Sequence, residues 1–193
     1  ISLSGTELKA DQVNLYDFSG YVLQAGLSTM VKKSDDSHNE WIQKAREANG
    51  KKVLTAPYST YVYSKSARYP QWFISLYRSF TNQYGRGVGV IETAKQCKSI
   101  FKSIISYEKK NHGNAASVYV FNESGDLIYP YDITADDTND ISKYYKLTDS
   151  DQDTLTVQSP VTDQKEYVSR LNSAYTGYTY LTIQPESVIL APV

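Results

Sequence analysis

The pattern of apolar and polar positions repeats half a chain apart. Residues 13–23 and 118–128 align without a gap at an offset of 105 residues. Each copy is an alternating apolar run, a polar turn with glycine, and a second apolar run, a pattern typical of a β-hairpin. Val, Ser and Gly are identical in the two copies, and five further positions keep their character. The pattern predicts two related α/β modules in tandem; a chance likeness between two short segments is the alternative.

Between the hairpins the pattern predicts a short helix, several strands and a longer helix. Residues 37–40 fit a capping box, and an apolar face from Trp41 to Ala48 then follows at helical spacing. Strand-like runs cover 53–63, 72–80 and 87–91. A second apolar stripe, from Cys97 to Ile105, predicts a connecting helix around residues 95–111. This helix is the natural bridge between the two modules.

The second half repeats this order with one expected difference. Residues 132–153 are acidic and poor in apolar side chains, which predicts a surface loop with at most a short helix. Strands are expected over 154–157, 166–171 and 178–183, and a new helix begins near Pro185. Residues 87–100 and 177–190 both run from glycine through a strand and a polar step into an apolar helix. The repeat therefore has two landmarks per module, in the same order.

Composition narrows the classes of function. A chain of 193 residues fits one large domain or two small ones. The net charge of −1 and scattered basic residues give no support to a nucleic-acid groove, and no apolar run is long enough to span a bilayer. The single cysteine excludes an internal disulfide. The 18 tyrosines suit half-buried strands first and wet recognition pockets second.

Five strings carry a resemblance to a known family. They are Trp41–Gly50, Phe73–Phe80, Gly87–Thr93, Val118–Ile128 and Tyr175–Pro185. In their order they resemble a double Cache domain, the PAS-like sensor region of bacterial membrane-bound histidine kinases. The resemblance implies an α+β fold of two tandem PAS-like modules, each a central antiparallel sheet flanked by helices. The expected modules are 1–111, membrane-distal with the connecting helix, and 112–193, membrane-proximal and ending at the start of the exit helix.

The resemblance also implies a function. It is extracellular sensing of a small molecule at the bacterial cell membrane, with ligand occupancy relayed through the C-terminal helix. The catalytic kinase domain, the flanking membrane segments and a homodimeric receptor are expected outside this chain. The long first helix usual in the superfamily would here be a stub over 3–8. Alternatives are the same module on a chemotaxis receptor or a cyclic-dinucleotide enzyme, or a secreted binding protein without membrane attachment.

The residues give no support to catalysis within this chain, to a cofactor or to a metal. His38 and His112 lie in polar surroundings typical of solvent-facing residues, and no G-x-S-x-G string or phosphate-binding glycine loop is present. Cys97 lies on an apolar stripe, as expected for an inert core thiol. Residues 149–153 have the alternating carboxylates of a calcium loop, but Thr154 and Pro160 replace its glycine and glutamate. A solvated acidic loop is the better interpretation.

Small-molecule binding is the main hypothesis, and the resemblance implies a site in the first module. Trp41 resembles the tryptophan of the amino-acid-binding version of the family, but Asn39 and Ile42 replace the arginine and tyrosine which that version places beside it. Tyr58 resembles a pocket tyrosine, and Glu92 falls near an acidic residue that could accept a ligand ammonium or hydroxyl. The predicted ligand-binding residues are Trp41, Tyr58, Tyr61, Tyr63, Trp72, Tyr77, Arg78 and Glu92.

Strand alternation divides the candidates on 72–80 between two faces. Trp72 and Arg78 share one face, and Tyr77 lies on the other. The sequence leaves open which of these faces meets the pocket. For the aromatic candidates the alternative is ordinary core packing, and for Arg78 it is a salt bridge with a neighbouring carboxylate.

Overall fold

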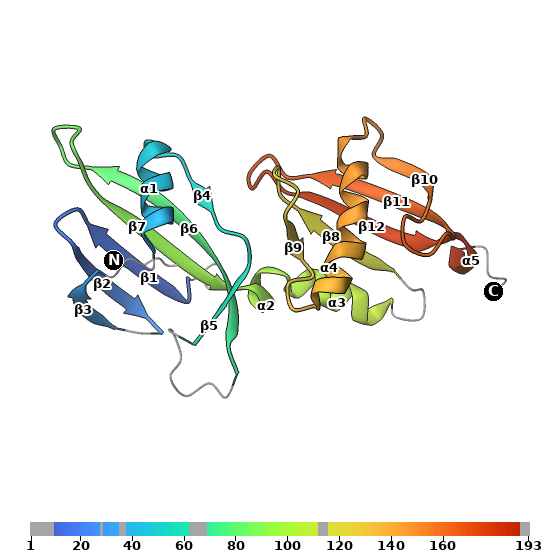
Figure 1. The fold of residues 1–193 in the computed structure, drawn as a ribbon, viewed down its shortest axis with the longest axis horizontal. Helices are drawn as coiled ribbons and strands as arrows, with labels where there is room; N and C mark the ends of the chain where they lie inside the picture. Colours follow the sequence, from blue (N-terminus) through green and yellow to red (C-terminus); the bar gives the residue numbers. More distant parts are fainter. Residues whose placement is uncertain (1–9, 28, 35–37, 62–68, 112–115, 190–193) are drawn as a thin grey trace. The chain divides into compact units, whose positions relative to one another are not determined.

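The computed structural model describes residues 10–189, except 28, 35–37, 62–68 and 112–115. The chain divides into two compact units, 1–99 and 100–193, each built on an antiparallel sheet (Figure 1). The predicted α+β class with two sheet modules is confirmed. The division falls after Ser99, whereas the sequence prediction ended the first module at 111.

In its described residues the first unit holds a seven-stranded sheet with the helix α1 packed on it. The sheet order is β3-β2-β1-β7-β6-β4, and β5 pairs with β6. The predicted run 53–63 is divided into two short strands in its described part. The elements are β1 (Gln12–Asp17), β2 (Tyr21–Gly26), β3 (Met30–Lys33), α1 (Asn39–Glu47), β4 (Val53–Leu54), β5 (Tyr58–Thr60), β6 (Gln71–Thr81) and β7 (Gly87–Gln96).

The second unit holds a five-stranded sheet in the order β10-β11-β12-β8-β9. The short helix α2 (Cys97–Ile100) lies at the division between the units. The remaining elements are α3 (Lys102–Lys110), β8 (Ser117–Phe121), β9 (Leu127–Tyr129), α4 (Ala135–Ser142), the 3-10 helix η3 (Lys143–Asp149), β10 (Thr154–Gln158), β11 (Lys165–Asn172), β12 (Thr179–Pro185) and α5 (Glu186–Ile189).

The sequence repeat is also a repeat of topology. The hairpins β1–β2 and β8–β9 each lie beside the last strand of their own sheet, β7 and β12 respectively. Next come the penultimate strands β6 and β11, and then β4 or β10. Both units therefore use the strand order 2-1-5-4-3 when their shared strands are numbered along the chain.

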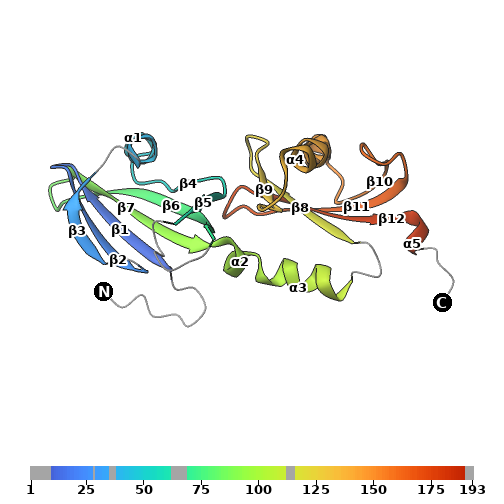
Figure 2. The same ribbon diagram turned by 60° about the horizontal axis from the view of Figure 1, so that its bottom comes forward.

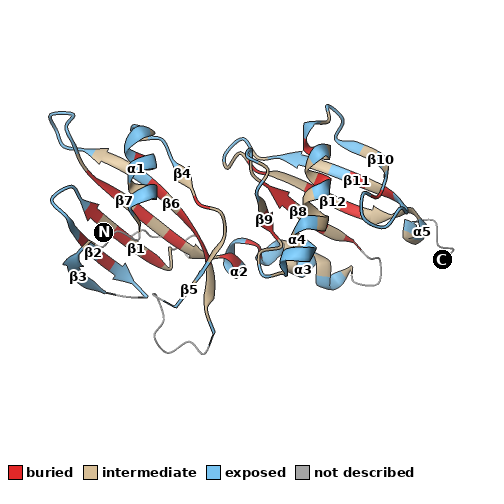
Figure 3. Cartoon of the chain, in the orientation of Figure 1, coloured by how far each residue is buried: buried red, intermediate tan, exposed pale blue. Residues whose placement is uncertain are grey.

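Helices cover one face of the first sheet and both faces of the second, and each core lies in the central strands. Figure 2 shows α1 over one face of the first sheet, and α4 and α3 on opposite faces of the second. The apolar core under α1 contains Ala45 of the helix and Tyr16 and Val90 of the sheet. The small Ala45 side chain lets the helix lie close to the sheet. Figure 3 shows the buried residues of both units gathered in these central strands.

The predicted core thiol is confirmed. Cys97 is fully buried at the start of α2. Burial raises the pKa of its thiol to about 12, so the thiol stays protonated at neutral pH.

The acidic segment 132–153 departs from its prediction as a loop. It contains α4 and η3, which together cover the second sheet as α1 covers the first. Thr134 begins α4, and its side-chain oxygen accepts the Asp137 backbone N–H at 3.1 Å. Ile141, Tyr144 and Tyr145 then pack on the sheet at helical spacing, so a few apolar residues suffice to fix this layer.

The first helix starts differently from its prediction. Its N-cap is His38, whose side chain makes no capping hydrogen bond. Ser37 of the predicted capping box lies outside the described residues. Over the described part of the chain, no helix combines the length and hydropathy needed to cross a membrane.

Candidate functional site

Polar side chains fill part of the interface between the first sheet and α1. Four residues here are fully buried although their side chains carry groups that water would solvate well: Gln12, Asn14, Ser75 and Glu92. They come from β1, β6 and β7, the three adjacent central strands. Burying such groups costs free energy unless hydrogen bonds replace their water contacts, so their partners decide what the cluster can do.

The Glu92 carboxylate is the centre of this cluster. Its Oε2 accepts hydrogen bonds from Asn14 Nδ2 at 2.7 Å and from the Tyr16 hydroxyl at 2.8 Å. Its Oε1 accepts one from Ser75 Oγ at 2.7 Å. These three donors are neutral groups, and each directs a hydrogen at a carboxylate oxygen inside the buried interface.

Further hydrogen bonds hold these donors in place. Gln12 Nε2 donates to Asn14 Oδ1 at 2.9 Å, which orients the Asn14 amide with its nitrogen toward Glu92. The Tyr58 hydroxyl lies 2.8 Å from Ser75 Oγ. Because Ser75 has one hydroxyl proton and gives it to Glu92, Tyr58 is the donor in that contact. The network therefore extends from the first strand of the sheet to β5.

The start of α1 meets this network through aromatic rings. His38 Nδ1 lies 2.8 Å from the Tyr77 hydroxyl and 4.0 Å from Glu92 Oε2. Trp41 stacks on Tyr77 with ring centroids 6.2 Å apart, and Lys44 lies 4.3 Å above the Trp41 ring. The first turn of α1 is thus fixed to the sheet by contacts with the polar cluster as well as by apolar packing.

Two tyrosine hydroxyls in the cluster remain neutral. Burial, with the Glu92 charge as the next cause, raises the pKa of Tyr16 well above its ordinary value. The same two causes, in the same order, raise the pKa of Tyr77. Both hydroxyls therefore act as hydrogen-bond donors beside a negative charge, in surroundings where that charge is weakly screened.

The structure brings together four of the eight predicted ligand-binding residues: Trp41, Tyr58, Tyr77 and Glu92. They share the sheet face under α1, which contains Phe73, Ser75 and Tyr77. This finding settles which face of β6 meets the helix.

Of the other four predicted residues, the three that the structure describes lie elsewhere. Trp72 and Arg78 are on the opposite face of β6, and Arg78 Nε donates to the Gly50 carbonyl at 2.5 Å. That bond ties β6 to the turn after α1 and replaces the predicted alternative of a salt bridge. Tyr61 is 55 % exposed, and Tyr63 lies outside the described residues.

Sequence reasoning missed five members of the cluster: Gln12, Asn14, Tyr16, Ser75 and His38. The interpretation of His38 as solvent-facing was wrong, because its ring contacts Tyr77 and its side chain is 26 % exposed. The missed signal is the alternation of Gln12, Asn14 and Tyr16 along one face of β1. Polar residues at every second position of a central strand indicate a buried polar network.

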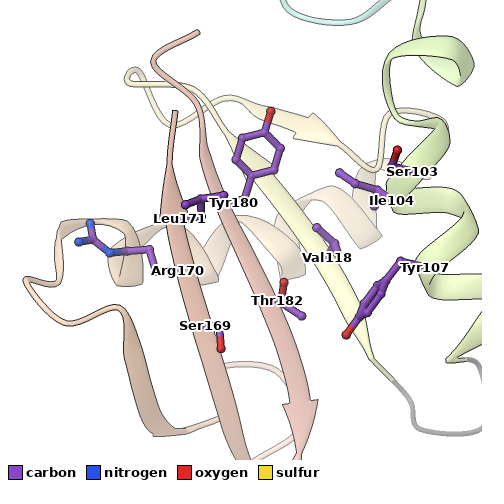
Figure 4. A pocket seen from close by; sticks show the side chains of 9 residues that line it. All are labelled: Ser103, Ile104, Tyr107, Val118, Ser169, Arg170, Leu171, Tyr180 and Thr182. Atoms are coloured by element: carbon purple, nitrogen blue, oxygen red, sulfur yellow. The ribbon is translucent and has the colours of Figure 1, made fainter. Parts of the chain in front are cut away.

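A second hollow lies in the second unit, on the sheet face away from α4. It has a volume of about 340 Å³ between α3 and the central strands β8, β12 and β11. Figure 4 shows Ile104 and Tyr107 of α3 facing Val118 and Thr182 of the sheet, while the Arg170 side chain points away. Its lining is mainly apolar, with none of the linked donors that surround Glu92. Among the described residues, no group of acidic, histidine or cysteine side chains is placed to hold a metal ion.

Comparison with known proteins identifies relatives by structure only. No protein-family model and no curated protein matches the sequence. The ligand-binding domain of the Pseudomonas aeruginosa PAO1 amino-acid chemoreceptor PctB, bound to L-Arg, matches with a TM-score of 0.66 at 14% identity, over 99% of this chain and 79% of its own. The extracellular domain of rpHK1S-Z16, named as a histidine kinase, matches with a TM-score of 0.63 at 16% identity, over 94% and 73%.

A third solved structure is the ligand-binding domain of Mlp24 with asparagine. It matches with a TM-score of 0.61 at 16% identity, over 93% of this chain and 70% of its own. At such identities these likenesses establish the fold. The predicted α+β fold of two tandem modules is therefore confirmed over nearly the whole chain.

Proposed function

From the tandem Cache fold, we propose that this chain is the extracellular sensor domain of a bacterial membrane receptor, and that its first module binds a small molecule at the Glu92 cluster. The observation that carries the proposal is a fully buried carboxylate held by three neutral donors from neighbouring strands. Such an arrangement keeps a negative charge in a weakly solvated interface. Ligand sites combine these few convergent polar groups with aromatic walls.

The chemistry of the cluster favours a ligand with an ammonium or hydroxyl group. The Glu92 carboxylate attracts a cation or a hydrogen-bond donor, and the faces of Trp41 and Tyr77 suit a cation or a flat apolar group. PctB and Mlp24 are solved with amino acids. Here Asn39 and Ile42 stand in place of the arginine and tyrosine that would recognise an amino-acid carboxylate. We therefore expect an amine or polyol contact at Glu92, and no arginine fork at position 39.

The proposed output is a two-component histidine kinase whose catalytic domain lies outside this chain. An extracellular domain named as belonging to a histidine kinase is among the structural relatives. In this proposal ligand binding shifts an equilibrium between two packings of the first module, and α5 passes the bias toward the membrane within a dimer. The ligand can shift this equilibrium only by its difference in affinity for the two packings. A chemoreceptor is the second candidate, because PctB shares the fold.

A thermal-shift screen tests the binding proposal. Amines, amino acids and polyols are each added to the wild-type chain, because a ligand of the folded state raises the melting temperature. A compound that stabilises the wild type should lose its effect in Glu92→Gln, which removes the charge and keeps the shape. Glu166→Gln is the matched control: Glu166 is also buried, but it belongs to the second module. An equal loss in both variants, or none in Glu92→Gln, contradicts the proposed site.

A further inference from the structure

A hollow separate from the Glu92 cluster lies at one end of the first sheet. It has a volume of about 480 Å³, which is within the range of small-molecule pockets. Its lining comes from the β1–β2 turn, the C-terminal end of α1, the end of β6 and the β6–β7 turn. None of these lining residues belongs to the Glu92 cluster.

Two arginines line this hollow from different elements. Arg46 comes from the last turn of α1 and Arg86 from the β6–β7 turn. In the part of the chain that the structure describes, neither forms an ion pair with a carboxylate within 4.0 Å. Two guanidinium groups at one hollow repel each other unless an anion lies between them. An oxyanion is the ligand that the fixed fork of guanidinium N–H groups binds best.

The position of Arg46 leaves its hydrogen-bonding edge available. Its guanidinium carbon lies 4.5 Å from the centre of the Phe18 ring, a cation–π contact. This contact uses the flat face of the guanidinium group, whereas N–H donors point outward in its plane. The neighbouring acids are engaged locally: Glu47 accepts from Gln43, and Asp17 accepts from the backbone of its own turn.

A backbone irregularity lies at the β6–β7 end of the hollow. The pairing of β6 with β7 shifts between Phe80 and Thr81, which pair with Gly89 and Gly87 respectively. A side chain at Gly89 would lie 2.8 Å from Phe80 Cζ and 2.4 Å from the Tyr16 carbonyl oxygen. Only glycine therefore lets the Phe80 ring lie close to β7 here. Such bulges re-aim side chains at the ends of strands.

Arg86 lies in the β6–β7 turn, whose backbone is held by hydrogen bonds to Asn82. The Asn82 side-chain oxygen accepts the backbone N–H groups of Tyr84 and Arg86, each at 3.0 Å. The Asn82 backbone N–H in turn donates to the Arg86 carbonyl at 2.9 Å. Arg86 thus starts from a fixed backbone position, which lowers the entropy cost of placing its side chain on a ligand.

We propose that this hollow binds a small organic oxyanion, a phosphate ester or a carboxylate attached to an aromatic or other apolar group. Arg46 and Arg86 bind the oxyanion from two sides. The Phe18 ring contacts the apolar part. The site is distinct from the Glu92 cluster in place and in charge, so this chain has two binding sites of opposite preference in one module.

Titrations followed by amide NMR test this proposal. Phenyl phosphate, benzoate and inorganic phosphate are added separately to the wild-type chain at low salt. We expect saturable shifts at the Asn49, Gly85 and Gly87 amides, with phenyl phosphate or benzoate binding several-fold more tightly than inorganic phosphate. The preference between phenyl phosphate and benzoate identifies the oxyanion; either order supports the site. No saturable shift at these amides up to about 20 mM of either aromatic compound overturns it, since weaker binding lies beyond the range of specific recognition.

Variants separate this site from general charge effects. Arg46→Gln and Arg86→Gln should each weaken binding by about tenfold, the loss expected for one charge-assisted pair. Lys98→Gln removes the same charge from the exposed surface of α2, beyond the other end of β7 from the hollow, and should change affinity less than about twofold, as for a distant screened charge. Glu92→Gln should leave this titration unchanged. Equal affinity in the wild type and the Arg46→Gln/Arg86→Gln double variant contradicts the proposal.

Discussion

The two modules share one strand order but place different chemistry between sheet and helix. Glu92 pairs with Asn14 across β7 and β1, and Leu181 pairs with Tyr119 across β12 and β8. The offset of the repeat relates Asn14 to Tyr119, so Leu181 occupies the place of Glu92. The first module thus buries a carboxylate where the second buries a leucine that is 0% exposed.

The residues around Glu92 are also more polar than those around Leu181. By the same register, Tyr16 corresponds to Phe121 and Ser75 to Val168, so two donors to the first carboxylate have apolar counterparts in the second module. All three strands of the second module therefore contribute to an ordinary apolar core. The comparison shows that a duplicated fold keeps its backbone pairing while the polar network is confined to one copy.

The second module does have a buried carboxylate, but it serves another contact. Glu166 on β11 accepts a hydrogen bond from the Tyr144 hydroxyl of η3 at 2.8 Å, and that hydroxyl also lies 2.8 Å from Ser159 Oγ. This bond ties the helical layer to the sheet. In the first module the donors to Glu92 come from the strands themselves. In both modules a buried tyrosine hydroxyl links the helical layer to the sheet: Tyr144 binds Glu166 in the second module, and Tyr77 contacts His38 in the first.

The largest expected effect comes from giving the second module the charge of the first. Leu181→Glu should lower the free energy of unfolding by about 5 kcal/mol at pH 7, because an ionised carboxylate would be buried among apolar side chains. The folded-state pKa of that glutamate would be raised, so the loss should shrink as the pH falls toward 4 and the group becomes protonated. Urea unfolding at the two pH values measures both effects.

Leu181→Ile keeps the site apolar and serves as its control. The expected cost is below about 1.5 kcal/mol, with no pH dependence of its own. If Leu181→Glu unfolds like the wild type at pH 7, the second interface tolerates charge and the contrast between the modules fails.

A smaller change exchanges single hydroxyls between the modules. Tyr16→Phe should cost about 2 kcal/mol, the contribution of a hydrogen bond to a charged group, because it removes a donor to Glu92. Phe121→Tyr adds a hydroxyl at the matching apolar place and should also destabilise, by about 2 kcal/mol. Denaturant midpoints of both variants test this reciprocity. A stabilising Phe121→Tyr would reveal an unexpected polar partner there.

The pattern of the sequence predicted the fold further than the site. Alternating apolar runs gave both hairpins, and the spacing of glycine, strand and helix gave the central strands of each sheet. The polar network was harder to foresee, because β1 buries Gln12, Asn14 and Tyr16 while Val13 and Leu15 lie on the other face. Hydropathy alone assigns the core to the opposite face. Only the hydrogen bonds across three strands make the polar face stable.

The helical layers show the same limit of sequence reasoning. Residues 132–153 are acidic and poor in apolar side chains, and the segment was therefore expected to be a surface loop with at most a short helix. Its Asp, Thr and Asn residues also have a low intrinsic helix propensity. The Thr134 cap and the packing of Tyr144 and Ile141 on the sheet outweigh this weak propensity. For His38, sequence position near a helix start gave no indication that its ring would face Tyr77.

Alkaline pH should lower the stability of the first module through Tyr16. Tyr16 has a raised pKa in the folded state, whereas an unfolded tyrosine loses its proton near pH 10. Above pH 10 the unfolded state therefore binds fewer protons than the folded state, and stability falls as the pH rises. At pH 11 the Tyr16 share of this loss is about 1.4 kcal/mol, and it should be absent in Tyr16→Phe. Parallel pH profiles for wild type and variant would contradict this assignment.

The smallest expected effect concerns the N-termini of α4 and α1, which differ in side-chain capping. Thr134→Ala removes the N-cap of α4 and should cost about 1 kcal/mol, whereas Thr134→Ser keeps the hydroxyl and should cost less. The first helix has no side-chain cap, since the His38 ring is directed at Tyr77. Thermal unfolding of the two Thr134 variants measures the difference. Equal stability of the two variants would show that packing alone fixes α4.

Hydrogen–deuterium exchange with and without a compound from the thermal-shift screen tests the central claim most directly, because it reports where the ligand binds. We predict slower exchange in α1, β1 and β7 on binding, and loss of that protection in Glu92→Gln. Exchange in α4 and η3 should change less, since the matching interface there is apolar. Protection centred on α4 and η3, or unchanged protection in Glu92→Gln, would contradict the assignment of sensing to the first module.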